Sequence, residues 1–353
     1  MKPLVPEDID AGYHVAAEGR AWHRAIAASA LGALRHSDPA RILKDAWPRD
    51  ERAALILRGA VNPTTTADFP VANITDAFRS LAPGSAALAL FERGLKLDLT
   101  GLNSIRVPGI AAWPSQAVFV AEGAAGPSIQ WRFGGAVVGP TKKILILAAA
   151  TGELEAANPL TTSAVVGRVL ADATNKSIDM VAFGTAPADD VQPPGLLNGV
   201  VPIPAAGPGL DEMAAMAEDL GALIGAVGEA SIDPTDAVFV CSPREAMIIK
   251  SKVGPRFDNP ILTTLGLPAK AVACFAPAAI ASGYQGGPQI ETSHQAVYHA
   301  EAATPEEIVD AGGALAVPTI STFQSDVISI KVRGRAAWAV TPGGAQVIQN
   351  VNW

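Results

Sequence analysis

The segment from Ile105 to Leu147 most constrains the fold of this chain, because it consists of short β-branched and aromatic runs interrupted by Pro and Gly. Such runs predict strands, and their succession predicts one long antiparallel hairpin. Aromatic side chains recur along both arms: Trp113, Phe119, Trp131 and Phe133. A hairpin of this length with aromatics on both faces cannot be fully covered by its own chain, so we expect it to contact a partner surface.

The composition is typical of a globular chain that exposes few charged side chains to solvent. Its 353 residues are 49% hydrophobic, enough for one large domain or two intimately joined domains with a substantial core. Only 17% are charged, while 33 Gly and 28 Pro indicate many turns. The formal net charge of −8 disfavours a general nucleic-acid-binding protein, which needs clustered Lys and Arg.

Cysteine usage and the N-terminus give no sign of export. Cys241 and Cys274 each lie in an apolar run, which predicts two buried free thiols. The start, MKPLVPEDID, has neither the basic beginning nor the apolar core of a signal peptide. No apolar run approaches the roughly 18 residues that a spanning helix needs. We therefore expect no membrane association.

Two helical regions flank the hairpin. Apolar spacing predicts helix over residues 15–58, in which Asp38-Pro39 starts a second short helix that Pro48 closes. The polar linker 62–66 marks the end of what reads as a small, detachable unit. Asn158-Pro159 predicts a helix of roughly 35 Å that Gly184 stops. Its apolar or small stripe would comprise Val166, Val169, Leu170, Ala173, Ser177, Met180 and Val181.

A second, mixed module follows the Pro-rich connector 192–209. The pattern predicts a helix capped by Asp211, a strand over 237–241, a helix started by Ser242-Pro243 and a strand over 270–275. A loop over 282–289, a strand over 296–299 and a helix starting at Thr304-Pro305 come next. Period-two strands over 327–332 and 336–340 are expected to rejoin the sheet of the first module.

The sequence contains no recognisable catalytic or metal-binding motif. None of the five histidines has ligand spacing to a Cys or carboxylate, and neither a nucleophile elbow nor a phosphate-binding loop occurs. The compact basic clusters are Lys142-Lys143 and Lys331, Arg333 and Arg335. They read as a solvated strand edge or an inter-subunit ion-pair set, with contact to DNA as the lesser alternative. We expect no catalytic residue, no cofactor and no metal.

The order of these elements resembles the major capsid proteins of tailed bacteriophages, which have the Hong Kong 97-like fold. The resemblance covers about Phe69 to Val351. Four stretches carry it: RVPGI with FVAEGAAGPSIQWRFGGAVVGPTKKI, then GTAPADDVQPPGLLNGV after the long helix, then VFVCSPREAMII, and finally SDVISIKVRGRAAWAVTPGGAQVI. Each stretch is diffuse, and their joint order is what resembles the family.

The resemblance implies an α+β fold with five segments. Residues 1–58 would be a helical segment, scaffold-like or cleaved during maturation, and 59–104 the N-terminal arm and its continuation. Residues 105–150 would be the extended loop that lies over a neighbouring subunit. Residues 151–195 with 323–353 would form the peripheral domain around a long spine helix, and 196–322 the axial domain.

The resemblance also implies a structural function: a head protein that self-assembles into pentamers and hexamers of an icosahedral shell around double-stranded DNA. Its partners would be other copies of itself, a portal, a scaffold or protease, decoration proteins and, weakly and non-specifically, packaged DNA. It would be found in the virion capsid after assembly in the bacterial cytoplasm. The residues expected at inter-subunit contacts are Trp113, Phe119, Glu122, Trp131, Arg132, Phe133, Arg168, Lys176, Arg333 and Arg335.

Some alternatives stay open at this level. The hairpin aromatics are equally well read as ordinary hairpin core residues. Some relatives join subunits through an isopeptide bond from a lysine of the extended loop, but no lysine lies between Lys96 and Lys142, so we expect no such cross-link here. An encapsulin-like compartment, or a soluble α/β enzyme with an unrecognised site, would also be compatible with the composition.

Overall fold

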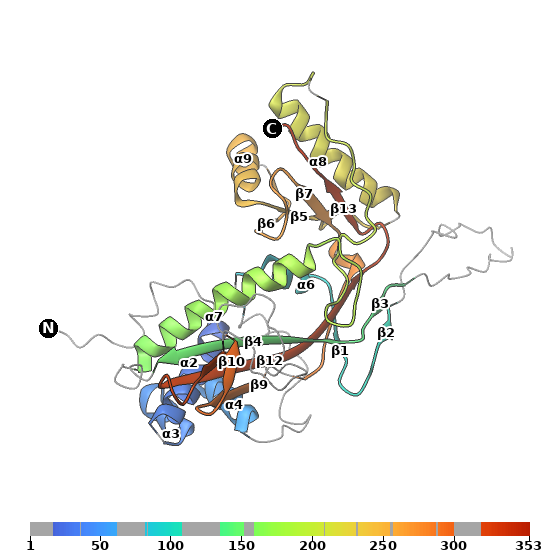
Figure 1. The fold of residues 1–353 in the computed structure, drawn as a ribbon. Helices are drawn as coiled ribbons and strands as arrows, with labels where there is room; N and C mark the ends of the chain where they lie inside the picture. Colours follow the sequence, from blue (N-terminus) through green and yellow to red (C-terminus); the bar gives the residue numbers. More distant parts are fainter. Residues whose placement is uncertain are drawn as a thin grey trace. The chain divides into compact units, whose positions relative to one another are not determined.

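The computed structural model describes residues 17–35, 37–61, 82, 84–107, 135–151, 159–207, 209–230, 232–254, 257–286, 289–299 and 319–353 (Figure 1). These residues form two compact units. Unit 1 takes its described residues from 1–83, 144–174 and 287–334, and unit 2 from 84–143, 175–286 and 335–353. The chain therefore passes between the units several times, so neither unit is continuous in sequence.

Unit 1 combines three N-terminal helices with a small antiparallel sheet. Its helices are α2 (Ala17–Leu34), α3 (Pro39–Ala46), α4 (Glu51–Val61) and the first part of α7 (Pro159–Ala182). Its strands are the larger part of β4 (Lys142–Thr151), β9 (Gln289–Ser293), β10 (Val297–His299), β11 (Thr319–Ser321) and the first half of β12 (Val327–Val340). Strand β12 lies between β4 and β9, and β10 pairs with β11.

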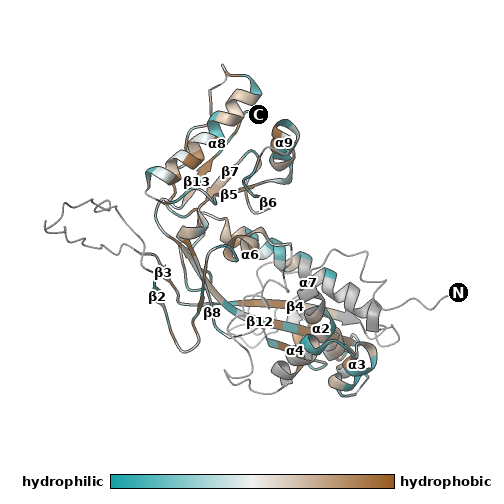
Figure 2. Cartoon of the chain, turned by 180° about the vertical axis from the view of Figure 1, so that it is seen from behind, coloured by the Kyte–Doolittle hydropathy of each residue, from teal (hydrophilic) through white to brown (hydrophobic). Residues whose placement is uncertain are grey.

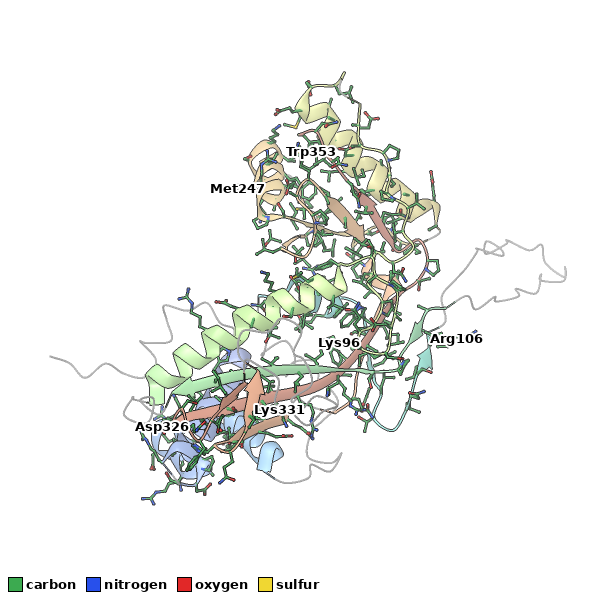
Figure 3. The ribbon with its side chains drawn as sticks, viewed as in Figure 1. Lys96, Arg106, Met247, Asp326, Lys331 and Trp353 are labelled. Atoms are coloured by element: carbon green, nitrogen blue, oxygen red, sulfur yellow. The ribbon has the colours of Figure 1, made fainter. Side chains whose placement is uncertain are left out.

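One face of this sheet is apolar and buried, whereas the other carries charged side chains on β9 and β12 and the exposed Leu145 and Leu147 on β4. Strand β12 alternates accordingly: Ile328, Ile330 and Val332 are buried, and the residues between them are more exposed. Lys331 (Figure 3) lies opposite Glu291 of β9 and forms an ion pair with it. The apolar face is covered by α2, as Figure 2 shows from behind. The sequence indicated a detachable helical unit, whereas α2 contributes to the core of unit 1.

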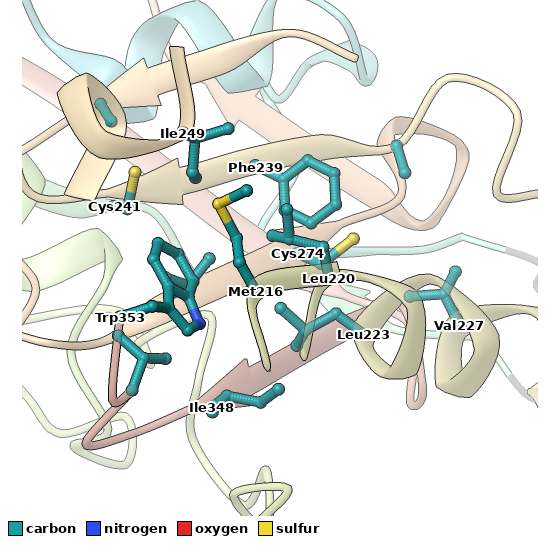
Figure 4. Packing of buried hydrophobic residues seen from close by; sticks show 14 of the residues in the cluster. Met216, Leu220, Leu223, Val227, Phe239, Cys241, Ile249, Cys274, Ile348 and Trp353 are labelled. Carbon is teal, nitrogen blue, oxygen red and sulfur yellow. The ribbon is translucent and has the colours of Figure 1, made fainter. Parts of the chain in front are cut away.

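Unit 2 is built around a four-stranded sheet. The strand order is β13 (Ala345–Ile348), β7 (Val272–Phe275), β5 (Val238–Cys241) and β6 (Ile261–Thr263), with β6 parallel to β5 and the other pairs antiparallel. Helix α8 (Glu212–Glu229) packs on β7 and β13, and α9 (Pro243–Val253) packs on β5 and β6. The core between α8 and the sheet includes Met216, Leu220, Phe239 and Trp353 (Figure 4).

A second group of strands in unit 2 is formed by β1 (Leu95–Asp98), β8 (Ile280–Tyr284) and the last part of β12. Strand β8 is parallel to β1 and antiparallel to β12. The short helix α6 (Ala86–Phe91) precedes β1, and the 3₁₀ turn η3 (Pro277–Ala279) precedes β8. Phe91 of α6 stacks on Trp338 of β12 with ring centroids 5.3 Å apart. Strand pairing thus places 282–284 in β8 and Gln289 in β9, so the predicted loop over 282–289 is wrong for these residues.

The base of the predicted hairpin is present in unit 2. Strand β2 (Ile105–Arg106) pairs antiparallel with β3 (Val137–Val138), and the Val107 amide donates to the Ala136 carbonyl at 2.9 Å. Gly139 follows with φ +116°, and a Cβ there would lie 2.5 Å from the carbonyl oxygen of Asn103. Only glycine fits this close approach. The rest of the hairpin, residues 108–134, lies outside the described residues.

Most local predictions hold. The helix starts at Asp38, Asp211 and Ser242 are confirmed by side-chain caps that accept from Ala40, Ala214 and Arg244 amides. The two closing strands are one continuous strand, β12, and β13 pairs with β7 in unit 2. The predicted helix at Thr304-Pro305 lies outside the described residues. The assignment of five segments to capsid-like domains stays a prediction.

The predicted apolar stripe of the long helix α7 is wrong over its last turns. Ala173, Ser177 and Met180 are exposed, whereas Thr174, Ile178 and Asp179 are buried. Helical spacing fits either set, and the exposed stripe contains more apolar residues. The second set is buried because the Asp179 carboxylate accepts four hydrogen bonds from residues of unit 2. A sequence pattern does not reveal these distant donors. The side chains of Val166, Val169 and Leu170 lie outside the described residues.

Candidate functional site

The described residues show no candidate metal centre. They contain no group of three or more His, Cys, Asp or Glu side chains that could hold a metal ion. Cys241 and Cys274 are buried and free, as predicted, and burial raises the pKa of each thiol to about 12. Both thiols therefore stay protonated at neutral pH and are poor nucleophiles. No helix in this part of the chain is long and apolar enough to span a bilayer.

The candidate functional feature is instead a surface, and its position is fixed by Asp179 near the end of α7. The Asp179 side chain is 5% exposed. Its Oδ1 accepts from the Ser85 hydroxyl at 2.6 Å and from the Ala87 amide at 3.0 Å. Its Oδ2 accepts from the Ala86 amide at 3.2 Å and from the Thr264 hydroxyl at 2.7 Å. A buried carboxylate is stable only when its lone pairs are satisfied in this way.

These bonds bring the turn after β6 against α7. Thr264 is held directly, and a Cβ at Gly266 would lie 2.5 Å from the Asp179 carbonyl oxygen and 3.1 Å from the Met180 nitrogen. The residue between them, Leu265, is 71% exposed, and Met180 beside it on α7 is 55% exposed. We call Met180 and Leu265 the α7 patch. Both are large apolar side chains that stay exposed next to a buried polar network, and we take them as candidate contact residues.

Helix α9 presents another exposed apolar side chain. Met247 is 67% exposed on α9 (Figure 3), which packs against β6, the strand leading to Leu265. The helix begins at the N-cap Ser242, whose hydroxyl accepts from the Arg244 amide and donates to the Glu245 carboxylate. Glu245 is fully buried and also accepts from the Lys270 amide at 3.3 Å. The bonds of Ser242 and Glu245 thus fix the orientation of the helix that carries Met247.

The buried Glu245 carboxylate should make the stability of unit 2 depend on pH. Burial alone would raise the pKa of Glu245, but hydrogen bonds from Ser242, its own amide and the Lys270 amide, with the charge of Arg244, hold the pKa below its ordinary value. The ionised carboxylate therefore stabilises the folded state above the unfolded pKa of about 4.3, and this contribution is lost as pH falls through the lower folded-state pKa.

Urea denaturation of the wild type and of Glu245→Gln from pH 8 to pH 3 measures this contribution. We expect the difference in unfolding free energy between the two proteins to be constant at neutral pH and to shrink below about pH 4.3. The same substitution at the exposed Glu229 is the matched control and should leave the pH profile unchanged. A difference for Glu245→Gln that is as large at pH 3 as at pH 7 would contradict the electrostatic explanation.

The segment Pro193-Pro194-Gly195-Leu196-Leu197 folds back on the end of α7. The Leu196 amide donates to the Ala182 carbonyl at 2.7 Å, and both leucines are buried. A Cβ at Gly195 would lie 1.9 Å from the Gly184 carbonyl oxygen, so this approach requires glycine. The indole of Trp338 donates to the Pro194 carbonyl at 2.8 Å. Residues 193–197, which belong to one of the stretches that carry the sequence resemblance, therefore form the turn by which the chain leaves α7.

Comparison with known proteins gives a clear answer at the level of structure alone. No protein-family model matches the sequence, and no curated protein matches it. Solved structures do match, including one from Mycobacterium phage Adephagia with 13% identity and a TM-score of 0.52, covering 76% of this chain and 91% of that chain. One from Microbacterium phage Oxtober96 has 15% identity and a TM-score of 0.51, covering 75% and 91%. The capsid of an empty GTA particle has 12% identity and a TM-score of 0.50, covering 75% and 90%. The chain has the phage major capsid protein fold.

The sequence-predicted contact residues are distributed over this capsid fold rather than gathered at one place. Arg168 and Lys176 are exposed on α7, and Arg168 forms an i,i+4 ion pair with Asp172 at 3.8 Å. Arg333 lies 3.3 Å from Glu291 and also contacts Gln289, and Arg335 donates to Gln285 at 3.4 Å. The hairpin residues lie outside the described residues: Trp113, Phe119, Glu122, Trp131, Arg132 and Phe133. Inter-subunit contact by any of the ten stays a prediction.

Sequence reasoning missed the α7 patch and Met247 of the capsid fold. Met180 was assigned to the buried stripe of α7, and Leu265 lies in a Thr-Thr-Leu-Gly-Leu turn without periodicity. Asp179 itself was one available signal. If this acidic residue is buried, the buried face of α7 shifts by one residue and Met180 becomes exposed. The sequence alone did not show that Ser85 and Thr264 would satisfy that carboxylate.

Proposed function

We propose that this chain is a major capsid protein that associates with copies of itself into a closed icosahedral shell around double-stranded DNA. The observation that carries the proposal is the fold likeness, which spans about three quarters of this chain and about nine tenths of structures that include a GTA capsid. Such a role is structural rather than enzymatic, in keeping with the inert thiols Cys241 and Cys274.

The surface of unit 2 supports self-association. A shell of identical subunits needs contacts that close into rings while tolerating different angles. Met180 on α7, Met247 on α9 and Leu265 in the turn after β6 expose apolar side chains, and burying them in a contact between copies would be favourable. We propose that these residues contact neighbouring copies within pentamers and hexamers.

The remaining parts are assigned by the same proposal. Residues 105–150 would be the extended loop over a neighbour, 151–195 with 323–353 the peripheral domain, and 196–322 the axial domain. The hairpin aromatics, together with Arg168, Lys176, Arg333 and Arg335, would add inter-subunit contacts. A portal, a scaffold or protease and decoration proteins would be the other partners. The assembled protein would be found in virion capsids formed in the host cytoplasm.

Size-exclusion chromatography and negative-stain microscopy of the purified protein test the proposal. We expect large closed particles or capsomers, because weak contacts repeated over many copies favour closed assemblies. A monomer or dimer under all conditions of salt, pH and concentration would contradict it. Particles isolated from the natural host should contain double-stranded DNA, whereas an enclosed enzyme would indicate a protein compartment.

A further inference from the structure

The apolar face of the unit 1 sheet has a partner within the chain. Ile290 of β9 with Ile330 and Val332 of β12 are each 4% exposed or less. They form one cluster with Ala25, Ile26 and Ala30 of α2, and partly buried side chains of α4 and β4 adjoin it. Contacts between α2 and β9 and between α4 and β9 support the same arrangement. Without these helices the sheet would present a contiguous aliphatic surface to solvent.

Helix α2 is buried on a second side by its own neighbours. Ala21, Ala27, Ala28 and Leu31 form another cluster with buried side chains of α3 and α4, among them Leu43, Trp47, Ala53 and Leu57. Alanines on both sides allow the helix to approach the sheet and the other helices closely. Gly32 extends this close packing, because a Cβ there would lie 2.6 Å from the Pro39 ring. Helix α2 therefore packs on the sheet with one side and on α3 and α4 with another.

A polar clamp ties the three helices into one body. Arg24 of α2 lies 2.8 Å from the Asp50 carboxylate, and the two side chains are only 17% and 12% exposed. The other Asp50 oxygen accepts from the Ala53 amide at 2.9 Å, so Asp50 also caps α4. The Arg24 guanidinium lies 5.9 Å from the Trp47 ring centroid at the end of α3. A partly buried ion pair that also caps a helix and meets an aromatic ring fixes their mutual geometry.

We infer that residues 17–61 are the permanent covering layer of this sheet face, and that they stay bound to the rest of the subunit even when the backbone after them is cut. Their removal would require separating two apolar surfaces, and the bared sheet would then be open to aggregation. This differs from a scaffold segment that is discarded after cleavage. The inference concerns the subunit itself, and only its extension to assembled particles rests on the proposed function.

A protease site inserted between Asn62 and Pro63 tests the inference in the full chain. After cutting under native conditions, we expect the fragment that ends at Asn62 to co-elute with the remainder on size exclusion, with both identified by mass spectrometry. Hydrogen exchange of Gln289–Ser293 and Val327–Val332 should be unchanged by the cut. Separation of the fragment from a remainder that keeps its melting transition would overturn the inference.

Two alanine substitutions provide a matched pair of variants. Ala30→Asp places a carboxylate in the fully buried contact with Ile290 and Ile330, and should release the cut fragment. Ala40→Asp makes the same change at an exposed position of α3 and should leave the fragment bound. If Ala30→Asp fails to fold before cutting, Ile26→Ala replaces it, with an expected rise of at least about tenfold in the dissociation constant of the fragment. A dissociation constant of the fragment that is the same in Ile26→Ala as in the unmodified protein would contradict the inference.

Mass spectrometry of assembled particles separates this inference from the proposed function. Particles that contain residues 17–61, whether or not the backbone is cut, would support both. Intact particles without these residues would overturn the covering role and leave the shell proposal standing. A subunit that retains the fragment but never assembles would leave the covering role standing and contradict the shell proposal.

Discussion

Replacing Asp179 with alanine is expected to lower the free energy of unfolding of unit 2 by about 3–5 kcal/mol, because four buried neutral donors lose the carboxylate that accepts from them. The substitution leaves two hydroxyls and two amides without their acceptor, from Ser85, Ala86, Ala87 and Thr264. Each unsatisfied buried donor costs about 1–3 kcal/mol before relaxation and water entry reduce the sum. Urea denaturation measures the global loss, and hydrogen exchange of residues 84–91 and 261–266 locates it.

Asp172→Ala is the control for Asp179→Ala. Asp172 lies on the same helix with its side chain 72% exposed, and it pairs only at 3.8 Å with an exposed arginine. Exposed pairs of this kind contribute about 0–1 kcal/mol. If the two substitutions had equal effects, Asp179 would not be the residue that fixes α6 and the turn after β6 against α7.

The double substitution Met180→Asp with Leu265→Asp is expected to abolish particle formation while leaving the unfolding transition nearly unchanged. Both side chains are more than half exposed in the subunit, so a charge there costs little folding free energy. In an interface the same charges would be desolvated without partners, at several kcal/mol per contact. Because a shell repeats each contact in every subunit, the loss should eliminate closed particles, which negative-stain microscopy and light scattering detect.

The volume-conserving pair Met180→Leu with Leu265→Met is the matched control and should assemble normally. Normal assembly of the Asp variant would show that the α7 patch is solvent-exposed in the particle. Loss of assembly accompanied by a large fall in melting temperature would mean that the substitutions act through folding, which would equally contradict a surface role for these two residues.

Features encoded within a few residues of sequence were predictable. Asp38, Asp211 and Ser242 cap the helices that follow them because an N-cap contacts amides two or three residues away. The hairpin base follows from local strand patterning, and Cys241 and Cys274 are buried because their whole runs are apolar. The order of such elements, read together, was enough to indicate the capsid fold.

Features that depend on distant partners were not predictable. The burial of Asp179 depends on donors that lie 85 to 94 positions away in sequence. The carboxylate of the buried Asp219 accepts from the Trp353 indole at 2.7 Å, across 134 positions. Ser282 lies in a strand rather than a loop because it pairs opposite Trp338. Helix α2 has alanines on several sides, so its sequence does not reveal which face meets the sheet. Candidate contact residues were likewise chosen by type, and exposure in the folded subunit was needed to identify Met180, Leu265 and Met247.

The burial of α2 on two sides restricts where this subunit can accept substitutions. Side chains larger than alanine at positions 25, 27, 28 or 30 would push against either the sheet or the neighbouring helices, so that helix should tolerate few substitutions. The corner between α3 and α4 is different, because Pro48 and Arg49 are exposed. For peptide display or site-specific labelling, that corner is therefore the favourable place for an insertion in the N-terminal region.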